Sequence, residues 1–130
     1  MIRRTALMTM VMLAVVVSSA GATTATRHQN PHYRVTASLL PTTVAVGGRL
    51  TVSFIVTNTT SRARTVEIEY GLDGPSSGQG GGIAGLRLAA HSSWTKTFKV
   101  TASDAGGYRA VVRATDRAGT SHAAATATAG

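Results

Sequence analysis

The side chains of this chain that could carry metal or acid–base chemistry are few and scattered. The sequence contains four histidines, five carboxylates and no cysteine. His28 and His32 have the i,i+4 spacing that would place two imidazoles on one face of a helix, where they could share a metal ion. Pro31 lies between them and argues against a helix. We therefore expect no metal site in this segment or elsewhere.

Catalytic groupings are equally hard to assemble. Glu67 and Glu69 are two residues apart, which on a strand makes them neighbours on one face instead of an acid and a base across a cleft. No local motif combines a serine, a histidine and an acid. A hydrolytic site would require His91, His122 and Asp104 to meet within hydrogen-bond reach. The sequence therefore predicts a protein that is not an enzyme and uses no cofactor.

A glycine-rich stretch fits the letters of the dinucleotide-binding fingerprint at Gly80, Gly82 and Gly85. That site needs a helix after the glycines to hold pyrophosphate, whereas residues 83–88 have the pattern of a strand. We interpret residues 74–82 as a loop between two strands, either a plain linker or a recognition loop. Its candidate contact residues are Gly78, Gln79 and Gly80.

The elements that must position these residues are strands, because apolar and polar residues alternate along most of the chain after residue 32. The clearest case is Leu50, Val52, Phe54 and Val56. Seven such segments, separated by turn signals, are typical of an all-β, antiparallel β-sandwich. They cover approximately residues 33–39, 50–56, 66–72, 86–88, 94–100, 108–114 and 122–128.

Residues 1–22 have the pattern of a secretory signal peptide. Two arginines, Arg3 and Arg4, precede an apolar run that is shorter than the roughly 20 residues a membrane-spanning helix needs. Small residues follow, and they predict cleavage after Ala22 or after Ala20. An uncleaved membrane anchor is the alternative. We expect a protein that is secreted or associated with the cell envelope.

Composition limits the rest of the chain to one domain. Residues 23–32 are polar and without periodicity, which predicts a flexible leader, and residues 33–130 form the domain. Because there is no cysteine, this domain must be held together by packing alone. The 13 basic and five acidic side chains give a net charge of +8, which permits attraction to acidic polymers and also serves solubility.

One local pattern resembles a known fold. The segment from Asp104 through Gly106 to Tyr108 is similar to the E–F corner of immunoglobulin-like domains, where a tyrosine hydroxyl bonds back to nearby backbone. The resemblance implies that Tyr108 is the corner tyrosine and that Asp104 and Gly106 shape the turn. Antibody domains differ, since they carry a cysteine pair and place their tryptophan on the third strand, whereas Trp94 is on the fifth predicted strand.

A closer resemblance is to the cysteine-free immunoglobulin-like class of bacterial exported proteins, which includes CARDB-like domains. The similar segments are residues 46–52, 56–59 and 107–110, and the resemblance covers about residues 33–128. It implies a seven-stranded immunoglobulin-like sandwich that serves as a binding module or a spacer, and it names no ligand.

The charges add a hypothesis about the surface. In an immunoglobulin-like sandwich the third and sixth strands are neighbours, which would place Glu67 and Glu69 beside Arg109 and Arg113 in a nearly neutral sheet. The other sheet would expose cations without acidic partners and could dock on an acidic polymer; a merely solvated surface is the alternative. Its predicted residues are Arg34, Arg49, Arg87 and Lys99.

The sequence thus predicts a non-catalytic immunoglobulin-like module at the cell surface or in the medium. Its partner would be an anionic polymer of the cell envelope or another exported protein. Nucleic-acid recognition is not expected, because no stacking aromatics accompany the arginines. The alternative function is a chaperone-like or inhibitor domain that pairs a partner strand onto its last strand, where residues 123–127 lack bulky and charged side chains.

Overall fold

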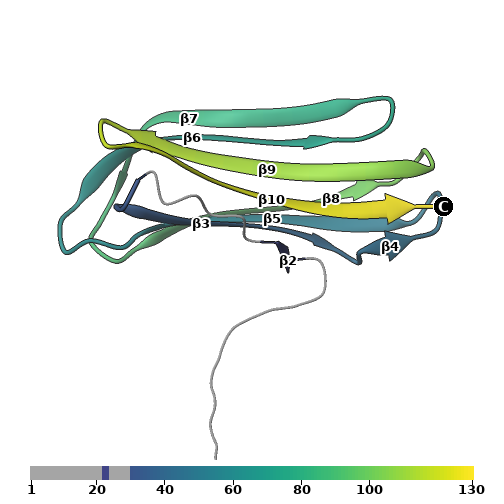
Figure 1. The fold of residues 1–130 in the computed structure, drawn as a ribbon, viewed down its shortest axis with the longest axis horizontal. Helices are drawn as coiled ribbons and strands as arrows, with labels where there is room; N and C mark the ends of the chain where they lie inside the picture. Colours follow the sequence, from purple (N-terminus) through teal and green to yellow (C-terminus); the bar gives the residue numbers. More distant parts are fainter. Residues whose placement is uncertain (1–21, 24–29) are drawn as a thin grey trace, which may run out of the picture.

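The computed structural model describes residues 22–23 and 30–130. Within these residues every regular element is a strand, and the strands form two sheets that lie one over the other (Figure 1). The all-β architecture predicted from the alternation is therefore confirmed. None of the described residues belongs to a helix long and apolar enough to cross a membrane.

The two sheets have the orders β4-β10-β9-β6-β7 and β2-β3-β5-β8. Neighbouring strands are antiparallel except β4 and β10, which run parallel. The strands are β2 (Ala22–Thr23), β3 (Tyr33–Leu40), β4 (Thr43–Val44), β5 (Arg49–Asn58), β6 (Arg64–Asp73), β7 (Gly78–Leu88), β8 (Ser93–Thr101), β9 (Gly106–Asp116) and β10 (Gly119–Ala129).

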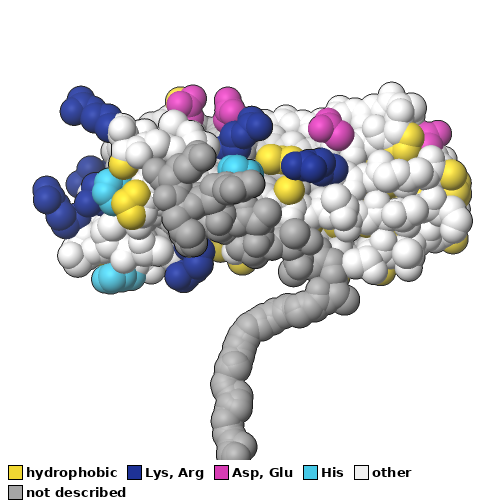
Figure 2. Space-filling model, in the orientation of Figure 1, with side chains coloured by type: hydrophobic (Ala, Val, Ile, Leu, Met, Phe, Trp, Pro, Cys, Tyr) yellow, Lys and Arg dark blue, Asp and Glu magenta, His cyan; other side chains and the backbone are white. Residues whose placement is uncertain are grey.

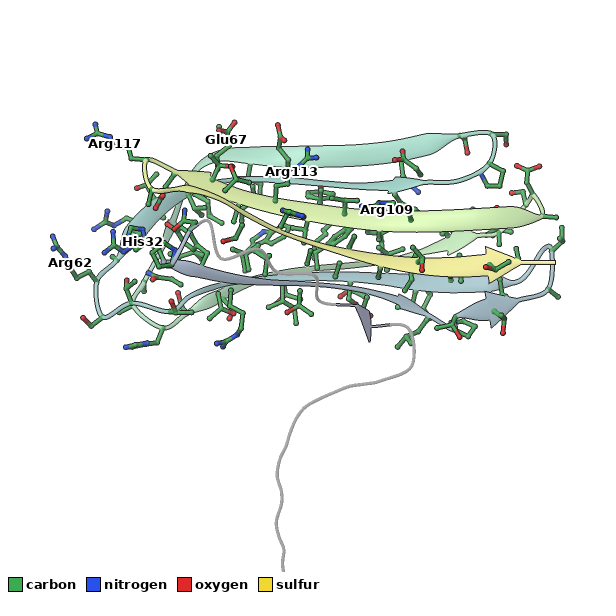
Figure 3. The ribbon with its side chains drawn as sticks, in the orientation of Figure 1. His32, Arg62, Glu67, Arg109, Arg113 and Arg117 are labelled. Atoms are coloured by element: carbon green, nitrogen blue, oxygen red, sulfur yellow. The ribbon has the colours of Figure 1, made fainter. Side chains whose placement is uncertain are left out.

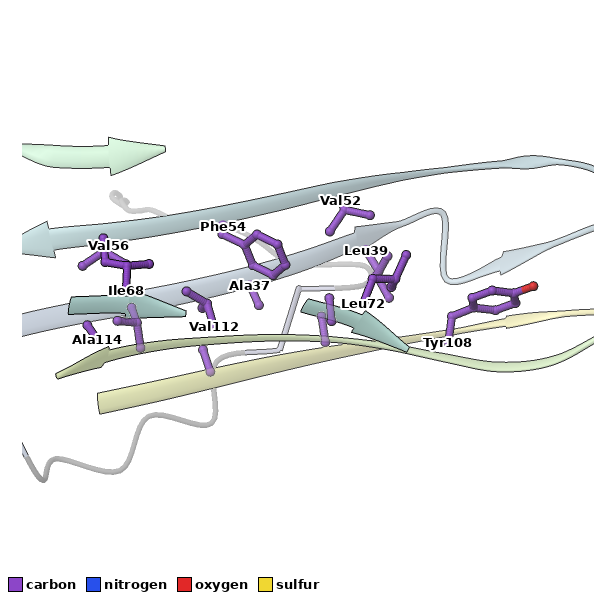
Figure 4. Close-up of a cluster of buried hydrophobic side chains, with 14 of the residues drawn as sticks. Ala37, Leu39, Val52, Phe54, Val56, Ile68, Leu72, Tyr108, Val112 and Ala114 are labelled. Carbon is purple, nitrogen blue, oxygen red and sulfur yellow. The ribbon is translucent and has the colours of Figure 1, made fainter. Parts of the chain in front are cut away.

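The core lies between the inner faces of the two sheets, as Figure 4 shows. On β5, alternate residues such as Val52 and Phe54 are fully buried, and on β6 and β9 so are Ile68 and Val112. The register places Ala37 of β3 opposite Phe54, so inward-facing residues meet inward-facing residues. Each fully buried aliphatic or aromatic side chain contributes about 1.5–3 kcal/mol, which is the main force holding the sheets together.

An aromatic group closes the side of the sandwich where the sheets end in β7 and β8. The ring centroid of Tyr70 lies 5.5 Å from that of Phe54 and 5.7 Å from that of Trp94, and Phe98 lies 6.2 Å from Phe54. Such spacings are favourable for aromatic pairs. Trp94 is half-buried against the core.

Lys96 breaks the apolar pattern of the inner face. It lies on β8 directly opposite the buried Phe54, yet its side chain is exposed, because β8 is the last strand of its sheet. A charged side chain in the inward register of an edge strand hinders the approach of another strand, since the ammonium would lose its water.

Three predictions about the strands need correction. The short strands β2 and β4 were not predicted, and β4 adds a parallel pair to a sheet expected to be antiparallel. The strand predicted at residues 86–88 is β7, which already begins at Gly78. Gly78, Gln79 and Gly80 are therefore strand residues paired with β6, and the loop shrinks to residues 74–77.

Backbone pairing explains this difference. Glycine has a low strand propensity, but the hydrogen bonds of a hairpin use only backbone groups, so β6 imposes the strand on its partner. The turn is closed by the Gly74 N–H, which donates to the Ser77 carbonyl oxygen at 2.8 Å. The fingerprint glycines 80, 82 and 85 all lie in this strand, which leaves no helix start beside them to hold pyrophosphate.

The predicted signal peptide, residues 1–22, and leader, residues 23–32, lie mostly outside the described residues. Of these two segments, residues 22–23 form β2 and pair with β3 at Ser38 and Ala37. Residues 30–32 are described as well, and they are tied into the fold by the hydrogen bonds discussed below.

Tyr108, near the start of β9, closes the β8–β9 connection. Its hydroxyl donates to the carbonyl oxygen of Asp104 at 2.9 Å and accepts from the Asp104 N–H at 3.2 Å. Gly106 has a φ of +127°, which side chains rarely tolerate, and a Cβ there would lie 2.9 Å from Pro75 Cγ. The hydrogen bond that the corner resemblance implied is present in the structure.

Replacing Tyr108 by Phe should lower the free energy of unfolding by about 1–3 kcal/mol, because two hydrogen bonds to the backbone of Asp104 are lost, each contributing about 0.5–1.5 kcal/mol. Urea titration followed by tryptophan fluorescence measures the change. Asp104→Ala is the matched control: it keeps both backbone groups of the corner and removes only the exposed bond from the Ser76 hydroxyl. Equal destabilisation by the two substitutions would contradict the assigned role of the tyrosine.

Candidate functional site

Charge is divided unequally between the two sheets. The strands β3, β5 and β8 carry four cations and no carboxylate, whereas the strands β6, β7 and β9 carry four cations and four carboxylates. The cations of the first group are Arg34, Arg49, Lys96 and Lys99. The charged residues of the second group are Arg64, Arg87, Arg109, Arg113, Glu67, Glu69, Asp73 and Asp116.

In the five-stranded sheet, opposite charges stand beside one another. β6 and β9 are neighbours, and their register places Glu69 opposite Arg113 and Asp73 opposite Arg109. The Glu69 Oε1 and Arg113 Nη1 atoms are 4.0 Å apart, and both side chains are more than half exposed. Such a pair contributes at most about 1 kcal/mol, so its main effect is to neutralise this surface.

The outer surface of the four-stranded sheet has no such balance. Three exposed cations, Arg34 on β3, Arg49 on β5 and Lys99 on β8, share this surface, which we call the basic face. Arg87, which the sequence analysis placed with them, lies instead on β7 opposite Thr65 in the other sheet. The tight turn at residues 74–77 sends the chain straight back along β6, and this fixes β7 in the β6 sheet.

Between its cations the basic face is covered by hydroxyl groups. Ser53 and Thr97 approach within 3.1 Å, and Thr57 and Ser93 within 2.7 Å. Two apolar side chains are the exceptions: Ile55 of β5 is 37% exposed and Leu40 of β3 is 44% exposed. Arg34 pairs with Thr57 and Lys99 with Thr51, so about 20 Å of strand separates the two cations. The spacing suits an extended ligand better than a single small ion.

A second group of cations gathers at one end of the sandwich. Figure 2 shows basic and histidine side chains at that end, and Figure 3 shows Arg62, Arg117 and His32 there. Arg62 is on the β5–β6 connection, Arg64 starts β6 and Arg117 is on the β9–β10 connection. We call this end, defined by Arg62, Arg64 and Arg117, the arginine end.

Buried Asn58 organises the β5–β6 connection at the arginine end. Its Nδ2 donates to the carbonyl oxygens of Arg62, Leu88 and Ala89 at 2.8, 3.1 and 3.2 Å. Its Oδ1 accepts from the N–H and the hydroxyl of Thr60 at 3.0 and 2.7 Å. One fully buried side chain thereby bonds the β5–β6 connection, the last residue of β7 and the residue after it.

Buried Asn30 performs a similar task beside it. Its Nδ2 donates to Asp116 Oδ1 at 2.7 Å and to the Gly119 carbonyl oxygen at 2.9 Å. The backbone carbonyl oxygen of Asn30 accepts from the Ser121 hydroxyl at 3.0 Å. The segment before β3 is thus fastened to the β9–β10 hairpin. No role for Asn30 was predicted from the sequence, because its partners lie almost ninety residues away in the chain.

Asp116 is the centre of this network. His32 Nδ1 lies 3.0 Å from Asp116 Oδ2, and the Ala118 N–H donates to Oδ1 at 2.8 Å. Burial on its own raises the pKa of the carboxyl, but the hydrogen bonds from His32, Ala118 and Asn30 and the charge of His32 outweigh it, so the pKa lies below its ordinary value.

A shallow cavity of about 290 Å³ opens next to this network, which we call the end recess. Its lining includes His32, Arg64, Asp116 and Arg117. Tyr33 lies close by: burial raises the pKa of its phenol, the charge of Asp116 adds to the rise, and the charge of Arg64 opposes it. From the sequence, His32 was a candidate only for metal binding together with His28, which lies outside the described residues.

The hydrolytic grouping considered from sequence is not assembled. His91 precedes β8 and Asp104 follows it, so the length of that strand, about 30 Å, separates them. Asp104 instead bonds Ser76 and the corner tyrosine. Within the described residues no group of three histidine or carboxylate side chains is placed to hold a metal ion.

The former loop candidates line shallow surface depressions. Gly80 is part of the floor of an open groove of about 550 Å³ on the outer surface of the five-stranded sheet, with Glu69 and Arg113 at its rim. Gly78 and Gln79 line a smaller depression beside Tyr108. These depressions exist because neighbouring positions on β6 and β7 are glycines.

No protein-family model matches this sequence, and neither does any curated protein. Among solved structures, the chain is similar to Pseudomonas fluorescens alkylpurine DNA glycosylase AlkC bound to DNA containing an abasic site analog, with 17% identity, coverage of 75% of this chain and 30% of that chain, and a TM-score of 0.49. It is also similar to Listeria innocua beta-glucosidase in complex with glucose, with 18% identity, coverage of 75% and 16%, and a TM-score of 0.47. The chain spans less than a third of either protein.

Asn58→Ala should lower the free energy of unfolding by about 2 kcal/mol or more, because it leaves buried carbonyl groups without donors. Thr57→Ala is the control next to it, since that hydroxyl bonds only the exposed Ser93, and its effect should stay within about 0.5 kcal/mol. Thermal and urea unfolding measure both. Similar effects of the two substitutions would contradict the organising role of Asn58.

Acid should weaken the fold through Asp116. Its pKa is lower in the folded chain than the roughly 3.9 of an unfolded one, so the carboxylate stabilises the fold above that value, and the contribution is lost as pH falls through the folded pKa. The difference in unfolding free energy between the parent and Asp116→Asn should therefore shrink below about pH 4. Urea titrations from pH 2 to pH 6 test this, and a difference that stays constant over the range would contradict it.

Proposed function

We propose that this chain is an exported, non-catalytic immunoglobulin-like module that binds an anionic polymer of the bacterial cell envelope through its basic face. The strand order supports the immunoglobulin-like part of the proposal. β3, β5 and β8 stand where such domains have A, B and E, and β6, β9 and β10 stand where they have C, F and G. The hydrogen bond of the corner tyrosine is in keeping with this assignment.

The observation that carries the binding proposal is the separation of charge between the sheets. The basic face has three exposed cations and no carboxylate on its strands, while the opposite sheet balances its charges. An unpaired cation close to an anionic surface contributes about 1 kcal/mol to association. The hydroxyl groups between the cations supply hydrogen-bond partners for an extended glycan or phosphate-containing chain.

Export rests on the pattern of residues 1–22. We expect the protein to be recovered from the envelope or the medium with Thr23, or Gly21 if cleavage follows Ala20, as its first residue. N-terminal sequencing of the recovered protein tests this. A chain that stays intact from Met1 in the cytoplasm would contradict it.

The binding proposal predicts that Arg34→Gln/Arg49→Gln/Lys99→Gln loses retention on isolated bacterial envelope and on heparin resin at low salt. The matched control is Arg87→Gln/Arg109→Gln/Arg113→Gln, which changes net charge equally on the other sheet. With about 1 kcal/mol for each cation, the first variant should bind roughly a hundredfold more weakly. Equal losses in the two variants would show that only net charge matters, and no loss in either would contradict the proposal.

A second candidate function is the addition of a partner strand to a free sheet edge. Residues 123–127 are less suited to this role, because apart from Thr126 they are almost wholly buried and β10 packs beside β3 of the other sheet. β7 is the better edge: it ends the five-stranded sheet, is largely exposed, and has Arg87 as its one charged residue. Capture of one envelope protein that resists high salt would favour this function over polymer binding.

A further inference from the structure

We propose that the end recess is a binding site for a phosphomonoester group, distinct from the basic face. The recess lies between the start of β6 and the β9–β10 hairpin, whereas the basic face is the outer surface of β3, β5 and β8. The two surfaces share none of the residues that define them. A failure of polymer binding by the basic face would therefore not contradict a phosphate site in the end recess, and the reverse also holds.

Cations dominate the lining of the recess. Arg64 lines it from the start of β6, Arg117 from the β9–β10 connection and His32 from the segment before β3. Arg62 is on the adjoining connection. Guanidinium groups present planar arrays of donors that match the oxygens of a phosphate. A dianionic ligand balances more of this charge than a monoanionic one does.

The one carboxylate in the lining is already engaged. Asp116 Oδ1 accepts from Asn30 Nδ2 and the Ala118 N–H, and Oδ2 faces His32 Nδ1 at 3.0 Å. Its charge is therefore directed at protein donors rather than at the open space. Because Nδ1 of His32 faces Asp116, Nε2 is the ring nitrogen left for a ligand.

Arg64 is positioned before any ligand arrives. Its Nε donates to the Thr60 hydroxyl oxygen at 3.0 Å, and that hydroxyl donates to Oδ1 of buried Asn58 at 2.7 Å. The arginine side chain is half-buried, and its terminal amino groups are not needed for this contact. An arginine fixed in this way loses less conformational entropy on binding an oxyanion than a freely rotating one.

The size of the recess decides between ligand classes. At about 290 Å³ it is at the lower end of small-molecule sites, which suits a terminal phosphate and the atoms next to it. An internal phosphodiester carries one charge and has chain on both sides. The end of a phosphorylated glycan or polyol and a free sugar or polyol phosphate share the phosphomonoester chemistry, and both are ligands of the proposed site.

The test is a titration of the purified protein by ¹⁵N-¹H NMR at pH 6 and constant ionic strength. The probes are glycerol 3-phosphate, inorganic phosphate, a phosphorylated oligosaccharide, sodium chloride and the diester glycerophosphoglycerol. We expect saturable shifts of the amides at Thr65 and Ala118, with a dissociation constant on the order of 1 mM for glycerol 3-phosphate. Tighter binding of the oligosaccharide would identify a polymer end as the source of the group, and equal binding would identify a free phosphate ester.

Variants separate a built site from general attraction. Arg64→Gln and Arg117→Gln should each weaken glycerol 3-phosphate binding about tenfold, while Arg109→Gln, on the same strand as Asp116 but outside the recess, should leave it unchanged. Thr60→Val keeps every charge but frees Arg64, and should weaken binding by a smaller factor. Each variant's NMR spectrum reports directly whether it is folded.

Three results would overturn the proposal. One is the absence of saturable shifts at the recess, and another is shifts spread evenly over all arginines with chloride as effective as phosphate. The third is binding of the diester as tight as that of the monoester, which would reject the dianionic group. None of these results bears on retention by the basic face, whose residues are untouched in these variants.

Discussion

Contact between two apolar inner faces is the interaction on which the rest of this structure depends. The chain has no cysteine, so nothing covalent joins the sheets. Alternate residues of β3, β5, β6 and β9 are fully buried, and Phe54 lies at the centre of an aromatic group that extends to the open side. Because one face of β3, β5, β6, β9 and β10 is committed to the core, these strands leave only their outer surfaces and ends for recognition.

At the arginine end, polar side chains complete what apolar packing cannot. Strand connections carry backbone groups without ladder partners, and burying them unpaired would be costly. Asn58 and Asn30 supply the missing donors and acceptors and draw the connections against the core. The same bonds hold Thr60 and Asp116, and through them Arg64 and His32. The hydrogen bonds that hold the strand connections against the core at this end therefore also position Arg64 and His32.

The sequence alone was sufficient to predict those strands in which apolar, buried residues alternate with polar, exposed ones. β5 and β9 were predicted to within a few residues, and the pairing of β6 with β9 followed from the resemblance at Tyr108. β7 was misplaced, because its glycines show no alternation and its sheet is decided by a hairpin with β6. Arg87 was misassigned for the same reason.

The candidate site was less accessible to sequence reasoning. The charge difference between the sheets could be anticipated, since it depends only on which strands are neighbours. The roles of Asn30, Asn58 and Asp116 could not, because each depends on partners far away in the chain that meet only after folding. An asparagine at the end of a well-defined strand, as Asn58 is, was the one available signal.

The inward-facing Lys96 has a consequence for how copies of this protein can associate. Of the two long outer edges in the described structure, that of β8 is guarded by this ammonium, and that of β7 carries no comparable charge over its glycine-rich half. β7 is thus the less protected of these two edges. Association through it would join two copies edge to edge, β7 to β7 about a two-fold axis, whereas the ammonium of Lys96 would oppose the same contact at β8.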